Sequence, residues 1–143
     1  MKIKYPVLTI PSDNYFYFIK NDEDLKNCNR QSLKKGFYNN LSIIDCNSKR
    51  YTIQKAIKKN TVGILWGFNL LKGQQLKVEL IFEEKVKSVS LIEFQDLLIE
   101  IMKKNQSLWD SGGDFKGIVQ FIKETNSIEE IIVKLTNDFY EEN

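Results

Sequence analysis

Two runs of alternating apolar residues, separated by a glycine turn, constrain the fold of this chain more than any other feature. The runs cover residues 62–70 and 76–82 of the 143-residue sequence. A period of two places one set of side chains on the same face of a β-strand. Gly73 lies between the runs and can adopt the positive φ that a short hairpin loop requires. The pattern predicts a long central hairpin whose buried face includes Trp66 and Phe82.

Two strands are predicted near the N-terminus. Residues 5–10 form the first strand, and Pro6 and Pro11 favour an edge position or an irregular start for it, because proline cannot donate a hydrogen bond to a ladder. Residues 15–20 are apolar or aromatic on both faces of the predicted strand. That pattern favours an inner strand with a helix packed on one side.

An early helix and a second hairpin are predicted before the central hairpin. Residues 23–35 begin with acidic residues and end with lysines, which matches the helix dipole, and Gly36 is placed to end the helix. Residues 41–46 and 49–57 predict a hairpin with one solvent-exposed face. Residues 86–89 are predicted to form a short strand or a connection.

After residue 90 the apolar period changes from two to about 3.6 residues, which indicates helices. Ser90 and Glu93 have the spacing of a capping box, and Ser127 and Glu130 repeat it. Asp114 is placed to cap a helix between these two. The sequence therefore predicts three C-terminal helices.

The order of these elements predicts the fold class. Strands and helices are segregated along the chain, which favours α+β with an antiparallel sheet over a doubly wound parallel sheet. We expect one domain over residues 1–143, with about five to seven strands, an early helix and three C-terminal helices packed on the sheet.

The chain contains no histidine and only two cysteines, Cys28 and Cys46. This composition excludes Ser-His-Asp and Cys-His catalysis and histidine zinc sites. Two thiols cannot complete a tetrahedral metal site, and we interpret both cysteines as buried small apolar side chains. The sequence predicts a protein that is not an enzyme and that binds no metal or cofactor.

Charge is distributed unevenly although the net charge is only +2. Residues 26–77 carry eleven Lys or Arg against the single acidic residue Asp45, whereas residues 78–143 carry seven Lys against fourteen acidic residues. A run of cations within the predicted second hairpin could follow a phosphate backbone. The candidate nucleic-acid-binding residues are Lys49, Arg50, Lys55, Lys58 and Lys59.

Acidic residues at the end of the last predicted helix suggest a different surface. Asp138, Glu141 and Glu142 oppose the dipole at that end, where cations are preferred. Trp109 and Asp110 lie in the loop before Asp114, and we interpret this loop as an inter-helix turn. Together these five residues are the candidate contacts for a partner protein with a basic surface.

Location and function are expectations at this stage. The N-terminal residues lack the features of a secretory signal, and no run reaches the roughly 20 apolar residues of a membrane span, so we expect a cytoplasmic chain without membrane contact. Bacterial immunity proteins, which neutralise a cognate toxin, are similar in size and also lack catalytic groups. This is an analogy between classes of protein, and no sequence motif supports it. We expect a small protein-binding module, with a basic toxin domain as its partner; binding of nucleic acid is the alternative.

Overall fold

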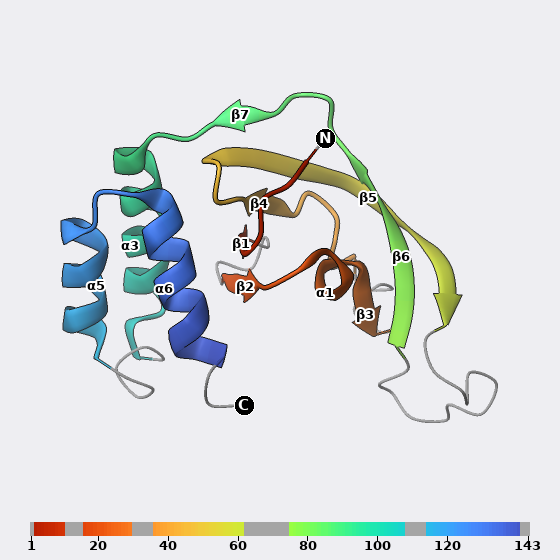
Figure 1. Cartoon of the computed structure of the whole chain (residues 1–143). Coiled ribbons are helices and arrows are strands. Elements are labelled where there is room, and N and C mark those ends of the chain that lie inside the picture. The colour runs from red at the N-terminus through yellow and green to blue at the C-terminus, as the bar shows by residue number, and fades with distance from the viewer. Residues whose placement is uncertain (1, 11–15, 30–35, 62–74, 108–113, 141–143) are drawn as a thin grey trace.

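The computed structural model describes residues 2–10, 16–29, 36–61, 75–107 and 114–140. Within these ranges, seven strands pair in one antiparallel sheet, with one short helix early in the chain and three helices after the last strand (Figure 1). The predicted α+β fold class is confirmed. The strands are β1 (Val7–Ile10), β2 (Tyr17–Ile19), β3 (Asn27–Asn29), β4 (Ser42–Ile44), β5 (Lys49–Thr61), β6 (Gln75–Phe82) and β7 (Lys87–Ser88). The helices are α1 (Asp22–Lys26), α3 (Leu91–Lys104), α5 (Phe115–Glu124) and α6 (Ile128–Tyr140).

The strand order is β2-β1-β4-β5-β6-β3, and β7 pairs with β5. Of the two predictions for the first strand, the edge position is wrong, because β1 lies between β2 and β4. The irregular start agrees with the bend at residues 5 and 6, which precedes β1. Pro6 and Pro11 flank β1 without entering it, so each of its residues keeps an N–H for the ladder. β2 was predicted as an inner strand and instead ends the order on this side. Its Phe18 is buried by the C-terminal helices rather than by a further strand.

The second strand of the predicted central hairpin exists as β6, but its pairing differs from the prediction. β6 pairs with the distal half of β5 on one side and with β3 on the other. β5 is 13 residues long, so this strand extends beyond the predicted range of residues 49–57. Residues 62–70, including Trp66, lie outside the described residues. Phe82 is partly buried, with its ring edge-on to Tyr51 at a centroid distance of 6.1 Å.

α1 ends before the predicted helix over residues 23–35 does, and residues 30–35 lie outside the described residues. Asn21 caps it, and its side chain accepts a hydrogen bond from a first-turn N–H at 2.8 Å. The backbone becomes extended at Asn27 and continues as β3. Only Leu25 of α1 is fully buried, so packing provides little stabilisation for a longer helix. Gly36 has a φ of 77°, as a glycine at a turn can, but it lies well beyond the end of α1.

The three C-terminal helices are confirmed together with their caps. Ser90 and Glu93 make both bonds of a capping box at the start of α3. The Asp114 carboxylate accepts a hydrogen bond from the third residue of α5 at 3.0 Å. Ser127 Oγ accepts one from the N–H of Glu130 at 3.2 Å. Each cap satisfies an N–H that has no partner within its helix.

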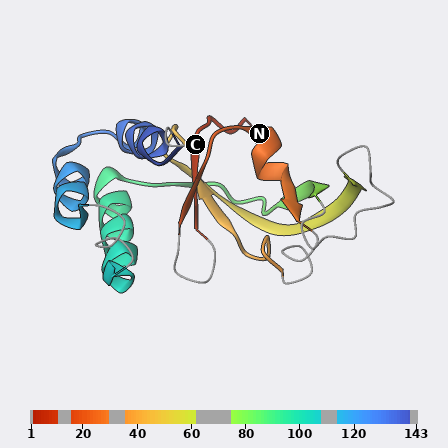
Figure 2. The same cartoon turned by 90° about the horizontal axis from the view of Figure 1, so that it is seen from below.

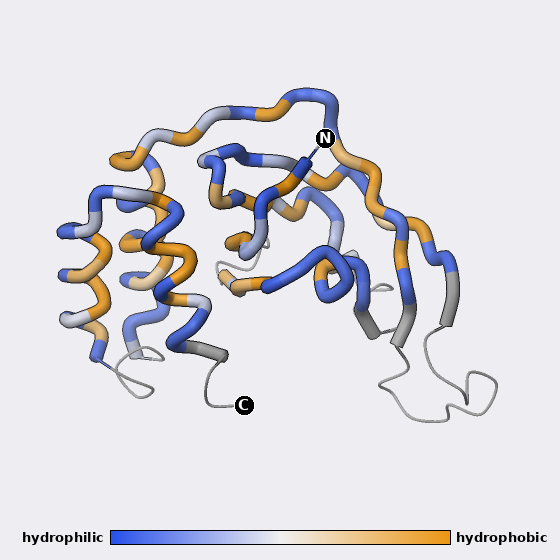
Figure 3. Tube along the Cα trace, in the orientation of Figure 1, coloured by the Kyte–Doolittle hydropathy of each residue, from blue (hydrophilic) through white to orange (hydrophobic). Residues whose placement is uncertain are grey.

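Two apolar cores lie on either side of β4, whose three residues are all buried. Ile44 belongs to the helix-side core, with Leu8, Phe18 and residues of α3, α5 and α6. Ile43 belongs to the sheet-side core, with Tyr51 and residues of β5, β6 and α1. Figure 2 shows the three helices grouped at one end of the sheet and the curved β5–β6 pair at the other. Apolar and polar positions alternate along the helices and strands that flank these cores (Figure 3).

Candidate functional site

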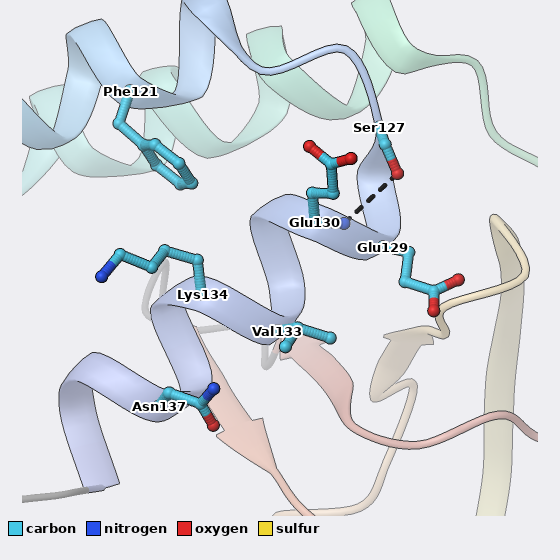
Figure 4. A pocket seen from close by; sticks show the side chains of 7 residues that line it. All are labelled: Phe121, Ser127, Glu129, Glu130, Val133, Lys134 and Asn137. Carbon is cyan, nitrogen blue, oxygen red and sulfur yellow. Dashed lines mark hydrogen bonds between the residues drawn. The ribbon is translucent and has the colours of Figure 1, made fainter.

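A groove of about 640 Å³ lies along α6 beside α5. Pockets of roughly 300–1,000 Å³ are typical of ligand and anchor sites in proteins. In Figure 4, Phe121 points from α5 toward α6, into the space above Glu130 and Lys134. The groove combines apolar, hydroxyl, amide and charged groups. Its lining comprises Phe121, Ser127, Glu129, Glu130, Val133, Lys134 and Asn137.

The helical period explains why these side chains meet. Residues three and four apart share one face of a helix, and this spacing aligns Glu130, Val133, Lys134 and Asn137 along α6. The neighbouring stripe of α6 is apolar and faces the helix-side core. Val133 lies at the border of the two stripes and is only partly buried. The groove therefore has an apolar base beside the core and a polar rim toward solvent.

Two ion pairs organise the charges around the groove. Lys4 Nζ lies 2.9 Å from a carboxylate oxygen of Glu129, and this hydrogen bond raises the pKa of Lys4 above its ordinary value. Lys134 Nζ lies 3.0 Å from Asp138 Oδ1, one helical turn away. All four side chains remain about half exposed, so solvent screens both pairs and they contribute little to stability. Glu130 is exposed on the rim of the groove and forms no such ion pair with a described residue.

Of the five residues predicted to contact a partner, Asp138 belongs to the described residues. It lies in the last turns of α6 with its carboxylate exposed, on the same side of the helix as Lys134. Lys134 offsets the unfavourable position of this carboxylate near the negative end of the helix dipole. Glu141, Glu142, Trp109 and Asp110 lie outside the described residues, so their part in the interface stays a prediction.

Sequence reasoning missed the apolar part of the groove. Phe121 and Val133 were not candidates, because a groove between two helices depends on how the helices pack. A signal was nevertheless present. Phe121 and Val133 are the sequence neighbours of Ile122 and Ile132, which are fully buried in the core. An apolar residue at such a position is often only partly covered by its own fold.

The candidate nucleic-acid-binding residues all lie on β5, but the structure divides them into two groups. Lys49 Nζ donates to Ser88 Oγ at 2.9 Å, and Arg50 donates to Ser42 Oγ at 3.3 Å. The other group occupies the distal half of the strand, beside β6, with exposed side chains. A strand advances by about 3.3 Å per residue, so the two groups lie well apart. The distal group comprises Lys55, Lys58 and Lys59.

A second hollow of about 320 Å³ lies at β6 near the end of α1. Lys26, Lys59 and Lys77 contribute to its lining, together with Glu79. Lys26 is paired with Asp22 at 2.8 Å, and its hydrogen bond lowers the pKa of that carboxyl group below its ordinary value. Two carboxylates thus offset much of the positive charge at this hollow.

The remaining chemistry of the described residues is sparse. No group of three or more His, Cys, Asp or Glu side chains is arranged to hold a metal ion in the part of the chain that the structure describes. Cys46 is buried as predicted, and burial raises the pKa of its thiol to about 11. The side chain of Cys28 is outside the described set. None of the described helices is both long and apolar enough to cross a membrane.

The chain was also compared with known proteins. It matches no protein-family model, no curated protein and no solved structure. The groove along α6 and the distal half of β5 are therefore the features on which a functional argument can be built.

Proposed function

We propose that this chain is a small cytoplasmic protein-binding module that masks the basic surface of a partner, as bacterial immunity proteins mask a cognate toxin. The main support for this proposal is the groove along α6. It offers a partly covered apolar base, formed by Phe121 and Val133, within a rim of charged and amide groups. Protein interfaces commonly combine a small apolar anchor site with a polar rim of this kind.

The chemistry of the rim favours a basic partner. Glu129, Glu130 and Asp138 line or adjoin the groove. Lys4 pairs with Glu129 and Lys134 with Asp138, so Glu130 is the carboxylate of the rim without such an ion pair among the described residues. Carboxylates at the rim of an interface speed the encounter with a basic surface and contribute to specificity more than to affinity. We propose that Glu141, Glu142, Trp109 and Asp110 belong to the same interface.

The proposal also explains why the chain needs no catalytic group. A protein that acts by covering another requires shape and charge complementarity but no nucleophile, base or metal. Toxin nucleases are often basic because they must approach phosphate, and they are a suitable class of partner for an acidic groove. We propose that the chain is not an enzyme.

Charge reversal on α6 tests the proposal. The partner is sought by co-purification with the product of the neighbouring gene, and its binding kinetics are then measured with purified proteins. Glu130→Lys combined with Asp138→Lys should slow association, with the largest effect at low ionic strength. Val133→Asp should speed dissociation, because it places a charge on the apolar base of the groove.

A matched control separates a local effect from a change in net charge. Asp96→Lys combined with Glu100→Lys makes the same charge change at exposed positions of α3. This control should leave binding close to that of the unmodified chain. Equal losses in the two double variants, with both proteins folded, would contradict a binding site on α6.

A further inference from the structure

The distal half of β5 has an open edge among the described residues. β4 pairs with β5 only from Arg50 to Thr52, and the backbone of Ile53 completes this side by bonding to Asn40 and Leu41. Beyond Ile53, the described strands provide β6 as the only neighbour of β5. Figure 1 shows this half of β5 at the border of the molecule, with β6 on its inner side.

An open edge is a binding surface in itself. Alternate residues of a strand direct their N–H and C=O groups to opposite sides, so an unpaired side offers a row of donors and acceptors. Extended peptides use such rows when they add a strand to a sheet, and their side chains then determine specificity. The open half of β5 is about as long as an ordinary strand of 5–6 residues.

The charged side chains at this edge are all exposed and all basic. Lys55, Lys58 and Lys59 are exposed, and Ile57 keeps 44% of its surface accessible. β5 contains five basic residues and no acidic residue. On β6, Glu79 pairs with Ile57 and is the nearest carboxylate in the register, while Lys77 adds a further cation opposite the end of β5. The edge therefore has a positive charge that Glu79 only partly offsets.

We propose that the distal edge of β5 accepts an extended, acidic segment of a partner protein as an additional strand of the sheet. Backbone hydrogen bonds would hold the segment, Ile57 would contact an apolar side chain, and the three lysines would face carboxylates. Lysines on an edge ordinarily oppose pairing with other strands. The same lysines make the edge selective, because only a segment that carries negative charge compensates them.

Two other occupants fit the edge less well. A second copy of the chain, paired across a twofold axis, would bring lysines near lysines, and like charges at facing positions destabilise a strand pair. Single-stranded nucleic acid is usually held by aromatic stacking as well as by cations. The aromatic residue of β5 is Tyr51, which is only 5% exposed and lies before the open half. Arg50 also lies before it, hydrogen-bonded to Ser42.

The test uses a synthetic peptide of roughly eight residues, within the usual range of strand lengths, that carries Glu on both faces of the strand together with Val and Thr. Binding is measured by titration with the full chain, and backbone amide NMR shifts identify the site. We expect saturable binding, with the largest shifts in β5 from residue 54 onward. The same peptide N-methylated at alternate backbone nitrogens keeps its charge but cannot donate along one edge, and it should not bind.

Protein variants complete the test. Lys55→Gln, Lys58→Gln and Lys59→Gln together should weaken binding of the peptide by about tenfold or more, as expected when three cations that face carboxylates are neutralised. The matched control is Lys103→Gln, Lys104→Gln and Lys123→Gln, which removes the same charge from exposed positions of α3 and α5. The control should bind as the unmodified chain does.

Several results would overturn the proposal. Equal binding of the N-methylated peptide, or of a peptide with Lys in place of Glu, would show that strand addition or charge selection does not occur. Tighter binding of a mixed-sequence single-stranded oligonucleotide would assign the edge to nucleic acid. Self-association of the unmodified chain through β5 would assign it to a second copy. None of these results bears on the groove of α6, which lies on a different part of the molecule.

Discussion

At the scale of single residues, Asp45 organises more of the structure than any residue that the sequence singled out for function. It is fully buried between β4 and β5. Its carboxylate accepts hydrogen bonds from the backbone N–H groups of Lys4, Asn47 and Lys49, each at 3.0 Å. Asp45 thereby shapes the tight turn between the strands, where Ser48 has a φ of 63°, and fixes the N-terminal segment to the sheet.

Removal of this carboxylate should be costly. Asp45→Ala leaves three backbone donors without their acceptor, and we expect the free energy of unfolding to fall by about 3 kcal/mol. Asp45→Asn retains one acceptor oxygen and should lose less. Urea unfolding of both variants measures the two values. A loss below about 1 kcal/mol for the alanine variant would mean that water replaces the carboxylate at little cost.

Single residues also show the limit of sequence reasoning about the site. The exposure of Asp138 follows from its place in the polar stripe of α6, and the helical period predicts that stripe. The position of Phe121 in the groove along α6 does not follow from any period, because it depends on how α5 packs beside α6. A periodic pattern specifies which face of a helix is apolar but not which neighbour covers it.

At the scale of elements, the long helices with caps were predictable, whereas the positions of the short strands in the sheet were not. α3 carries a 3.6-residue period over 14 residues and a capping box, so several independent signals agree. β1, β2 and β3 contain three or four residues each, and β1 pairs with β4 and β3 with β6 across long stretches of sequence. The position of a strand in a sheet depends on such non-local pairing, which explains the exchanged positions of β1 and β2.

The capping box of α3 gives a quantitative test at this scale. Ser90 Oγ accepts a hydrogen bond from the N–H of Glu93 at 3.2 Å, and Glu93 accepts one from the N–H of Ser90 at 3.4 Å. Ser90→Ala removes the first bond and weakens the second, so it should destabilise the protein by about 1 kcal/mol. Thermal unfolding measures the loss, and hydrogen exchange should accelerate first in the opening turn of α3.

Ser88→Ala is the control for this variant, since Ser88 is also exposed and lies just before the helix, in β7. Its hydroxyl accepts from Lys49 Nζ, an exposed bond that should contribute little. If the two serine variants lost equal stability, the capping box would not be the cause.

At the scale of the whole molecule, β4 joins the two cores. Ile43 and Ile44 are neighbours in the chain and are both fully buried, yet they belong to different cores because adjacent side chains of a strand point to opposite faces. The position of β4 therefore predicts that the two ends of the molecule unfold together.

Ile43→Ala tests this cooperativity, because Ile43 lies in the sheet-side core, away from the helices. Truncation of a fully buried isoleucine should lower the free energy of unfolding by about 3 kcal/mol. If unfolding is cooperative, the most protected amides of α3 and of β6 should both exchange faster by roughly a hundredfold, the factor that corresponds to this energy. Ile92→Ala, at an α3 position that is 69% exposed, is the control and should change neither set of rates. Faster exchange in β6 with unchanged exchange in α3 would show that the helices form a unit with its own stability, and that β4 does not transmit the loss.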